Sequence, residues 1–219
     1  MTTATEKRIY TIPTEKEHTI YKDANGNMLP GTTTVLSILA KPALYQWYFK
    51  MGKAGENPFK KKDNAADIGT IAHAFVMCHL KGWELDTSNL VPANVSTAEN
   101  CVLSYYEWEK GQELKPILIE SELVNGEWGG TVDLYAELNG EPCLIDFKTS
   151  SGIYVDMSYQ LAAYTQLLKD NGYPVSRAII LNIGKDENSD FQTKSWTNLD
   201  RELEIFRNCL NIYRLTRTK

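Results

Sequence analysis

Hydrophobic and polar residues follow two different periods along this chain, and the changes of period divide it into elements. A period of two, or a short apolar run between turn residues, predicts strands at 7–12, 17–22, 116–124, 128–138, 141–149, 176–183 and 191–196. Apolar positions three or four apart predict helices after Gly31, from Leu44 to Lys53, and at 67–80, 96–111, 155–171 and 198–219. The lysine-rich stretch between the second and third helices reads as a loop. This order predicts an α/β or α+β domain with a mixed central sheet flanked by helices.

The totals describe an ordinary globular protein. The chain has 219 residues, of which 42% are hydrophobic and 23% charged, which suits one domain with a substantial core. No apolar run approaches the roughly 18 residues needed to span a membrane, so we expect no membrane contact. The first ten residues resemble no targeting peptide, and we expect a cytoplasmic protein, bacterial or in a phage-infected host. The four cysteines are scattered without a CxxC pair, which predicts reduced thiols and no zinc or iron–sulfur cluster.

Charge is distributed unevenly. Residues 1–62 carry 10 basic and 5 acidic side chains, whereas residues 63–219 carry 13 and 23, which together give the net charge of −5. We therefore divide the single domain into basic N-terminal strands with a helical arm (1–62) and an acidic core (63–219). A basic arm beside an acidic body suits phosphate contacts beside a metal site, and uneven surface decoration is the alternative.

The apolar stretch LIDFKTS, residues 144–150, carries two opposite charges on one face. Asp146 and Lys148 are two residues apart, so a strand places them on the same side. If Asn139-Gly140 forms a two-residue hairpin turn, Asp133 lies directly opposite Asp146. Facing carboxylates repel one another, and a divalent cation between them removes that repulsion. The alternative is a solvated sheet face with ordinary charges, which fits poorly with the apolar residues around Asp146.

A neighbouring turn adds a third carboxylate to this face. If Asn125-Gly126 is also a two-residue turn, Glu120 faces Thr131 and lies on the diagonal to Asp133. Carboxylate oxygens are the ligands that Mg²⁺ and Mn²⁺ prefer. Carboxylates with a lysine on one face suit metal-assisted phosphodiester hydrolysis, in which the lysine orients water or stabilises charge on the phosphate.

Four short segments occur in a characteristic order: Gly69-Thr-Ile-Ala-His73, Gly130-Thr-Val-Asp133, Asp146-Phe-Lys148 and Gln160-Leu-Ala-Ala-Tyr164. Together they resemble the PD-(D/E)XK nuclease superfamily in its RecB-like exonuclease branch, most closely phage-type exonucleases and the mitochondrial genome maintenance exonuclease. The likeness runs from about residue 29 to the final helix. It implies a restriction-endonuclease-like core and an exonuclease that cleaves DNA with Mg²⁺ or Mn²⁺ and leaves 5′-phosphates, in recombination, repair or replication.

The resemblance also implies a role for each matched residue. Asp133 and Asp146 become metal ligands and Lys148 the catalytic lysine. His73 becomes an additional ligand that projects from its helix over the sheet. Gln160 and Tyr164, which lie on one helical face, position the phosphate or the water.

Two departures from the family pattern matter. The pattern places a glutamate four residues after the histidine, where this chain has Met77, and Glu120 is the candidate replacement. The segment Ile119-Glu120-Ser121 resembles the phage-type group and favours Glu120 over Glu122. The clustered cysteines of the iron–sulfur members are absent, which again predicts no cluster.

In such nucleases an N-terminal helical region can arch over the site and thread single strands. Here Trp47 supplies an aromatic ring for bases, and Lys60, Lys61 and Lys62 supply cations for phosphates. A packed aromatic and a solvated lysine loop are the plain alternatives.

We therefore expect DNA, as single strands or ends, to be the partner, with a recombination or replication protein as a further candidate. A DNA-binding protein that has lost catalysis and an endonuclease of the same fold are the competing hypotheses. The sequence leaves the oligomeric state open.

Overall fold

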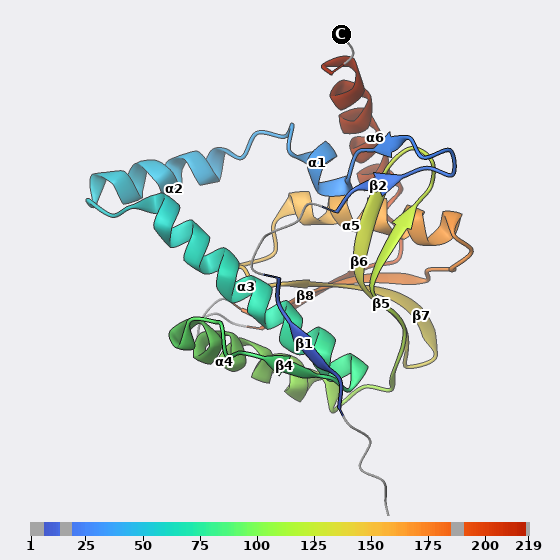
Figure 1. Cartoon of the computed structure of the whole chain (residues 1–219). Helices are drawn as coiled ribbons and strands as arrows, with labels where there is room; N and C mark the ends of the chain where they lie inside the picture. Colours follow the sequence, from blue (N-terminus) through green and yellow to red (C-terminus); the bar gives the residue numbers. More distant parts are fainter. Residues whose placement is uncertain (1–6, 14–18, 185–190, 218–219) are drawn as a thin grey trace, which may run out of the picture.

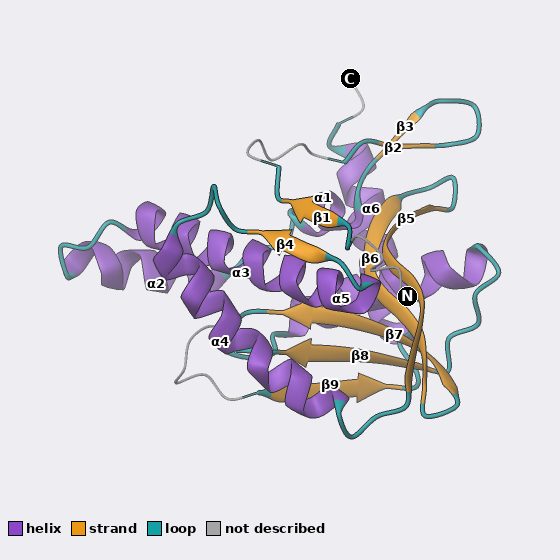
Figure 2. Ribbon diagram, turned by 60° about the horizontal axis from the view of Figure 1, so that its bottom comes forward, coloured by secondary structure: helices purple, strands orange, loops and turns teal. Residues whose placement is uncertain are grey.

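The computed structural model describes residues 7–13, 19–184 and 191–217. A five-stranded mixed sheet in the order β5-β6-β7-β8-β9 forms its centre (Figure 2). The strands are β5 (Leu114–Val124), β6 (Gly129–Leu138), β7 (Glu141–Lys148), β8 (Arg177–Asn182) and β9 (Gln192–Trp196). Strand β7 runs parallel to β8, and the other neighbours are antiparallel.

Helices cover both faces of this sheet. They are α1 (Thr32–Leu36), α2 (Pro42–Lys53), α3 (Pro58–Lys81), α4 (Pro92–Glu109), α5 (Val155–Asp170) and α6 (Asp200–Leu215). Side chains of β7 alternate between two cores, because successive residues of a strand point to opposite faces. Ile145 and Phe147 pack with α3 and α4, whereas Leu144 packs with α1, α5 and α6. The predicted mixed sheet flanked by helices is confirmed.

Short strands lie outside the central sheet. The strand β1 (Ile9–Thr11) pairs in parallel with β4 (Glu84–Asp86), and β2 (Tyr21–Lys22) pairs with β3 (Met28–Leu29). Strand β4 was not predicted, because three residues are too few to show a period. Part of the expected strand 17–22 lies outside the described residues. No described helix is long and apolar enough to cross a membrane.

Three helices begin earlier than predicted, and the first of them, α2, starts at Pro42 instead of Leu44. The expected loop that contains Lys60–Lys62 is the first turn and a half of α3, so that prediction is wrong. Asn57 caps this helix by accepting hydrogen bonds from the amides of Phe59 and Lys60 at 3.0 and 3.1 Å, and Pro58 suits the first helical position. Helix α4 likewise begins at Pro92 and not at Ser96.

The N-terminal helical arm is the part that extends furthest from the sheet. Helix α2 and the first half of α3 project together from the body (Figure 1). An aromatic contact joins the two helices, because the ring centroids of Tyr48 in α2 and Phe59 in α3 lie 5.6 Å apart; within α2, the Trp47 and Tyr48 centroids lie 5.3 Å apart. Three aromatic residues of the arm are mostly exposed to solvent: Tyr45 (66%), Phe49 (74%) and Phe59 itself (67%).

Candidate active site

The candidate site lies where strands β6 and β7 part. The predicted hairpin register is confirmed, because Leu138 pairs with Glu141 across the Asn139-Gly140 turn. Regular pairing ends at Leu134 and Ile145, one step before Asp133 and Asp146. There the carboxylate of Asp133 replaces a backbone acceptor: its Oδ2 accepts a hydrogen bond from the amide of Phe147 at 2.8 Å. The Asp133 side chain thus occupies the space between β6 and β7 where their backbone pairing stops, and it contacts the end of β7.

Asp146 and Lys148 form a buried ion pair. The Nζ of Lys148 lies 2.5 Å from Oδ2 of Asp146, and their side chains are 19% and 2% exposed. Among the described residues, neither Asp146 oxygen has a hydrogen-bond partner of regular geometry. Burial raises the pKa of Asp146, although Lys148 opposes that rise. Burial also acts to lower the pKa of Lys148, but the neighbouring carboxylates outweigh it and raise that pKa. Oδ2 of Asp146 therefore faces the Lys148 ammonium, and Oδ1 is the buried oxygen that is available to a cation.

Glu120 reaches the site by a different register from the predicted one. The turn after β5 holds four residues, 125–128, and not two, so Glu122 is opposite Thr131. Oδ1 of Asn125 accepts hydrogen bonds from the amides of Glu127 and Trp128, both at 3.2 Å. The fully buried Trp128 ring packs on Phe206, 5.1 Å between centroids, and anchors the longer turn.

This shift places Glu120 level with Asp133, between the ladder pairs formed by the residues on either side of it. Glu120 has a backbone φ of +47°, which is unusual for a residue with a side chain and is a form of strain found at functional sites. The residue is exposed overall, yet its carboxyl lies among protein atoms. That burial and the nearby Asp133 raise its pKa.

Helix α3 brings His73 to the same place. Its Nδ1 lies 3.8 Å from Oδ2 of Asp133. Gly69 allows this approach, because a Cβ there would lie only 2.6 Å from Oγ1 of Thr149 at the end of β7. One ligand atom from each of His73, Glu120 and Asp133 lies within 4.8 Å of the others. Two carboxylates and an imidazole are suitable ligands for a divalent cation, whereas Asp146, which the sequence also predicted as a ligand, is not in this group of three.

Gln160 and Tyr164 are on α5, one turn apart. The Nε2 of Gln160 donates to the Tyr164 hydroxyl at 2.8 Å. Burial, and then the charge of Asp146, raise the pKa of Tyr164 well above its usual value, which places this hydroxyl beside the candidate site. Gly130 makes room for the ring, since a Cβ there would lie 2.5 Å from Cε1 of Tyr164.

The predicted DNA contacts of the arm are not part of this cluster. Lys60, Lys61 and Lys62 are exposed on α3, and Trp47 is half-buried against Tyr48. The ammonium of Lys61 lies 2.8 Å from Glu56, and both side chains are about half exposed, so water weakens this pair. Their role in DNA binding stays a prediction.

Sequence reasoning missed a buried clamp behind Lys148. Asn182, 1% exposed, accepts a hydrogen bond from the amide of Ser150 and donates to its carbonyl, both at 2.9 Å. The Ser150 hydroxyl donates to the same Oδ1 at 3.1 Å, and the Ile183 amide donates to the Lys148 carbonyl at 2.8 Å. An asparagine at the end of an apolar strand is the one signal that could have suggested it.

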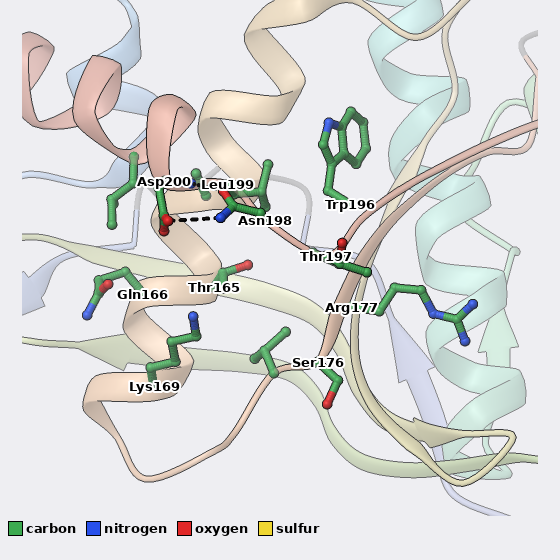
Figure 3. A pocket seen from close by; sticks show the side chains of 14 residues that line it. Thr165, Gln166, Lys169, Ser176, Arg177, Trp196, Thr197, Asn198, Leu199 and Asp200 are labelled. Atoms are coloured by element: carbon green, nitrogen blue, oxygen red, sulfur yellow. Dashed lines mark hydrogen bonds between the residues drawn. The ribbon is translucent and has the colours of Figure 1, made fainter.

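Two cavities differ in their relation to this cluster. One of about 580 Å³ opens on His73 and Glu120. The other, of about 180 Å³, lies between α5, the start of β8 and the start of α6, and Figure 3 shows its lining. None of the predicted site residues lines this second cavity, which is at the opposite end of β8 from Asn182.

Comparisons with known proteins give distant structural likenesses. No protein-family model and no curated protein matches the chain. An alkaline exonuclease (LHK-Exo) from Laribacter hongkongensis is 12% identical, with 86% of this chain and 92% of that one covered and a TM-score of 0.40. Its complex with dAMP gives 12% identity, coverages of 70% and 84%, and a TM-score of 0.33.

A protein from Eubacterium rectale that is provisionally named an exonuclease is 15% identical, with a TM-score of 0.44. The alignment covers 68% of this chain and 66% of that one, so this chain spans less than two thirds of its length. Likenesses of this size are too distant to assign a function, which therefore rests on the residues of the site.

Proposed function

We propose that the protein is a DNA exonuclease that uses Mg²⁺ or Mn²⁺ and leaves 5′-phosphates. The observation that carries this proposal is the buried pair of Asp146 and Lys148 beside the group of His73, Glu120 and Asp133. Burying a charge is costly unless it is paired or binds a metal, and the side chain of Asp146 is only 2% exposed. The motifs that resemble the RecB-like branch of the PD-(D/E)XK nucleases supply these same residues in order.

In this proposal Asp133 and Asp146 hold the cation, with His73 and Glu120 as further ligands. A bound divalent cation supplies polarisation of the phosphate and a lowered pKa for attacking water. The ammonium of Lys148 has three donors and no acceptor, so it orients the water or neutralises charge on the phosphate oxygens.

In this proposal the Tyr164 hydroxyl and the Gln160 amide, which are hydrogen-bonded to each other, would position the phosphate or that water. The cations on α3 and the aromatic rings of the arm would hold the phosphates and bases of a single strand that leads to the site.

The test is release of an end label from single-stranded and duplex DNA with either metal. We expect release by the parent protein, none after chelation, and a loss of at least about 100-fold in Lys148→Ala. Lys115→Ala removes an exposed lysine at the far end of β5 and is the matched control. Chromatography of the released nucleotides identifies the position of their phosphate.

The competing hypotheses give different results in the same assay. Cleavage of closed circular DNA by the parent would identify an endonuclease. Measurable DNA binding with no release under any metal would identify the binding-only protein, in which Met77 stands where the family pattern has a carboxylate.

A further inference from the structure

The 580 Å³ cavity extends away from the candidate metal ligands along one face of α3. Its walls come from α3, from β5 and from the segments around β1 and β4. Besides His73 and Glu120, they include Tyr10, Ile12, Met77, Lys81 and Trp83. A cavity of this volume is large enough for a nucleotide-sized ligand.

The floor of the cavity is a row of residues on α3. His73, Met77 and Lys81 are four residues apart and therefore lie on one helical face, about 6 Å apart along the axis. Met77 is 6% exposed and lies between the metal ligand and the cation. Its sulfur and the Ile12 side chain make this middle part apolar, and thioether sulfur packs well against aromatic rings.

The far end of the cavity is cationic. The ammonium of Lys81 lies 4.9 Å from the centroid of the Trp83 ring, an attractive cation–π geometry that holds the side chain in place. The guanidinium of Arg8 lies 5.9 Å from the same ring. A compact ammonium at the edge of a cavity is a suitable partner for a phosphate.

We propose that this cavity binds the deoxynucleoside next to the scissile phosphate, with its base against Met77 and Ile12 and its second phosphate on Lys81. The metal ligands at one end and Lys81 at the other suit two successive phosphates of a strand, and the apolar floor between them suits the base that the intervening sugar carries. Trp83 is a positioning residue, because it acts by holding Lys81. This inference rests on the proposed nuclease function and names the part of the substrate that the site recognises.

The first test measures binding without cleavage. The Lys148→Ala variant, which should not cleave DNA, is mixed with a fluorescein-labelled single strand of twelve thymidine nucleotides. Its affinity is measured over a range of salt concentrations. Each phosphate contact contributes about 0.7 to the slope of log affinity against log salt for a single strand. Adding Lys81→Ala should reduce the slope by about that amount, whereas adding Lys115→Ala should leave it unchanged. Equal slopes for the two double variants would overturn the proposal.

The second test removes a base. The oligonucleotide carries one abasic unit at the 5′ end, at the 3′ end or in the middle, and the parent's first cleavage is timed with excess enzyme. A base contact of the usual strength predicts that one terminal abasic unit slows this step about tenfold and the central one does not. Equal rates for all three oligonucleotides would contradict a base-binding cavity.

The two tests separate this inference from the proposed function. A parent protein that cuts no unmodified oligonucleotide with either metal refutes the nuclease, and the salt slopes then decide the cavity alone. Normal cutting with unchanged slopes and no abasic effect refutes only the cavity.

Discussion

Replacing Gly130 by alanine should lower stability, because this glycine lies directly beneath the Tyr164 ring. An added Cβ would lie 2.5 Å from Cε1 of Tyr164 and 2.9 Å from Oγ1 of Thr32. Ordinary contacts begin near 3.4 Å, so the ring or the strand must move by about 1 Å. Tyr164 is 5% exposed and tied to Gln160, which leaves it little room. Overpacking of this kind costs about 1–3 kcal/mol.

Urea unfolding followed by circular dichroism measures this cost. With a slope of about 2–3 kcal/mol per molar urea, we expect the midpoint to fall by roughly 0.3–1.5 M. Gly111→Ala is the matched control, since a Cβ there would lie 3.7 Å from the Trp108 carbonyl oxygen. Its midpoint should stay near that of the parent protein.

A double-mutant cycle identifies the side chain responsible. In a Tyr164→Ala background the ring is gone, so Gly130→Ala should cost much less than it does in the parent. The same cost in both backgrounds, or a Gly130→Ala midpoint equal to that of Gly111→Ala, would refute the proposed contact between Gly130 and Tyr164.

Three further substitutions test other contacts. Asn182→Ala leaves the Ser150 backbone without its partners and should cost about 1–3 kcal/mol in urea unfolding; a parent-like midpoint would contradict the clamp. Trp128→Ala empties a fully buried site against Phe206 and should cost about 3–5 kcal/mol by the same measurement, and a loss below 1 kcal/mol would mean that the turn is not anchored there. Gly52 is in α2, and a Cβ added there would meet open space, so Gly52→Ala should raise the free energy of unfolding by about 0.5–1 kcal/mol in the same measurement. A destabilised variant would count against a helix at this position.

The sequence predicted the central sheet well because its signals are local. The hairpin between β6 and β7 follows from Asn139-Gly140 and the alternation on either side of it. Asp133 and Asp146 therefore fall at one level, as the register required. The actual contact differs, since pairing stops one step earlier and the Asp133 carboxylate binds the Phe147 amide.

Other features depend on contacts between distant residues and were missed or misplaced. The turn after β5 is longer than predicted because Trp128 is buried against Phe206, 78 positions later in the chain. This shift moves Glu120 level with Asp133, closer to the centre than the predicted diagonal. The cavity next to His73 could not be foreseen either, because β4 is too short to show a pattern.

The prediction of the site residues depended on the order of the motifs along the chain more than on strand geometry. His73 carries no local sign of a ligand, and only its spacing from Gly69 singled it out. The structure supplies the physical reason for that spacing, since Gly69 lets α3 contact Thr149 and leaves His73 one turn further on, beside Asp133.

Helix α3 is continuous from Pro58 to Lys81, so the arm and the candidate metal centre share one rod. The lysines at its start and His73 are roughly 15–20 Å apart along the axis. If DNA binds the arm as proposed, a continuous helix would pass a tilt of the arm on to His73. The affinity for DNA and the affinity for the cation would then be linked, and each ligand would change the affinity for the other by the same factor.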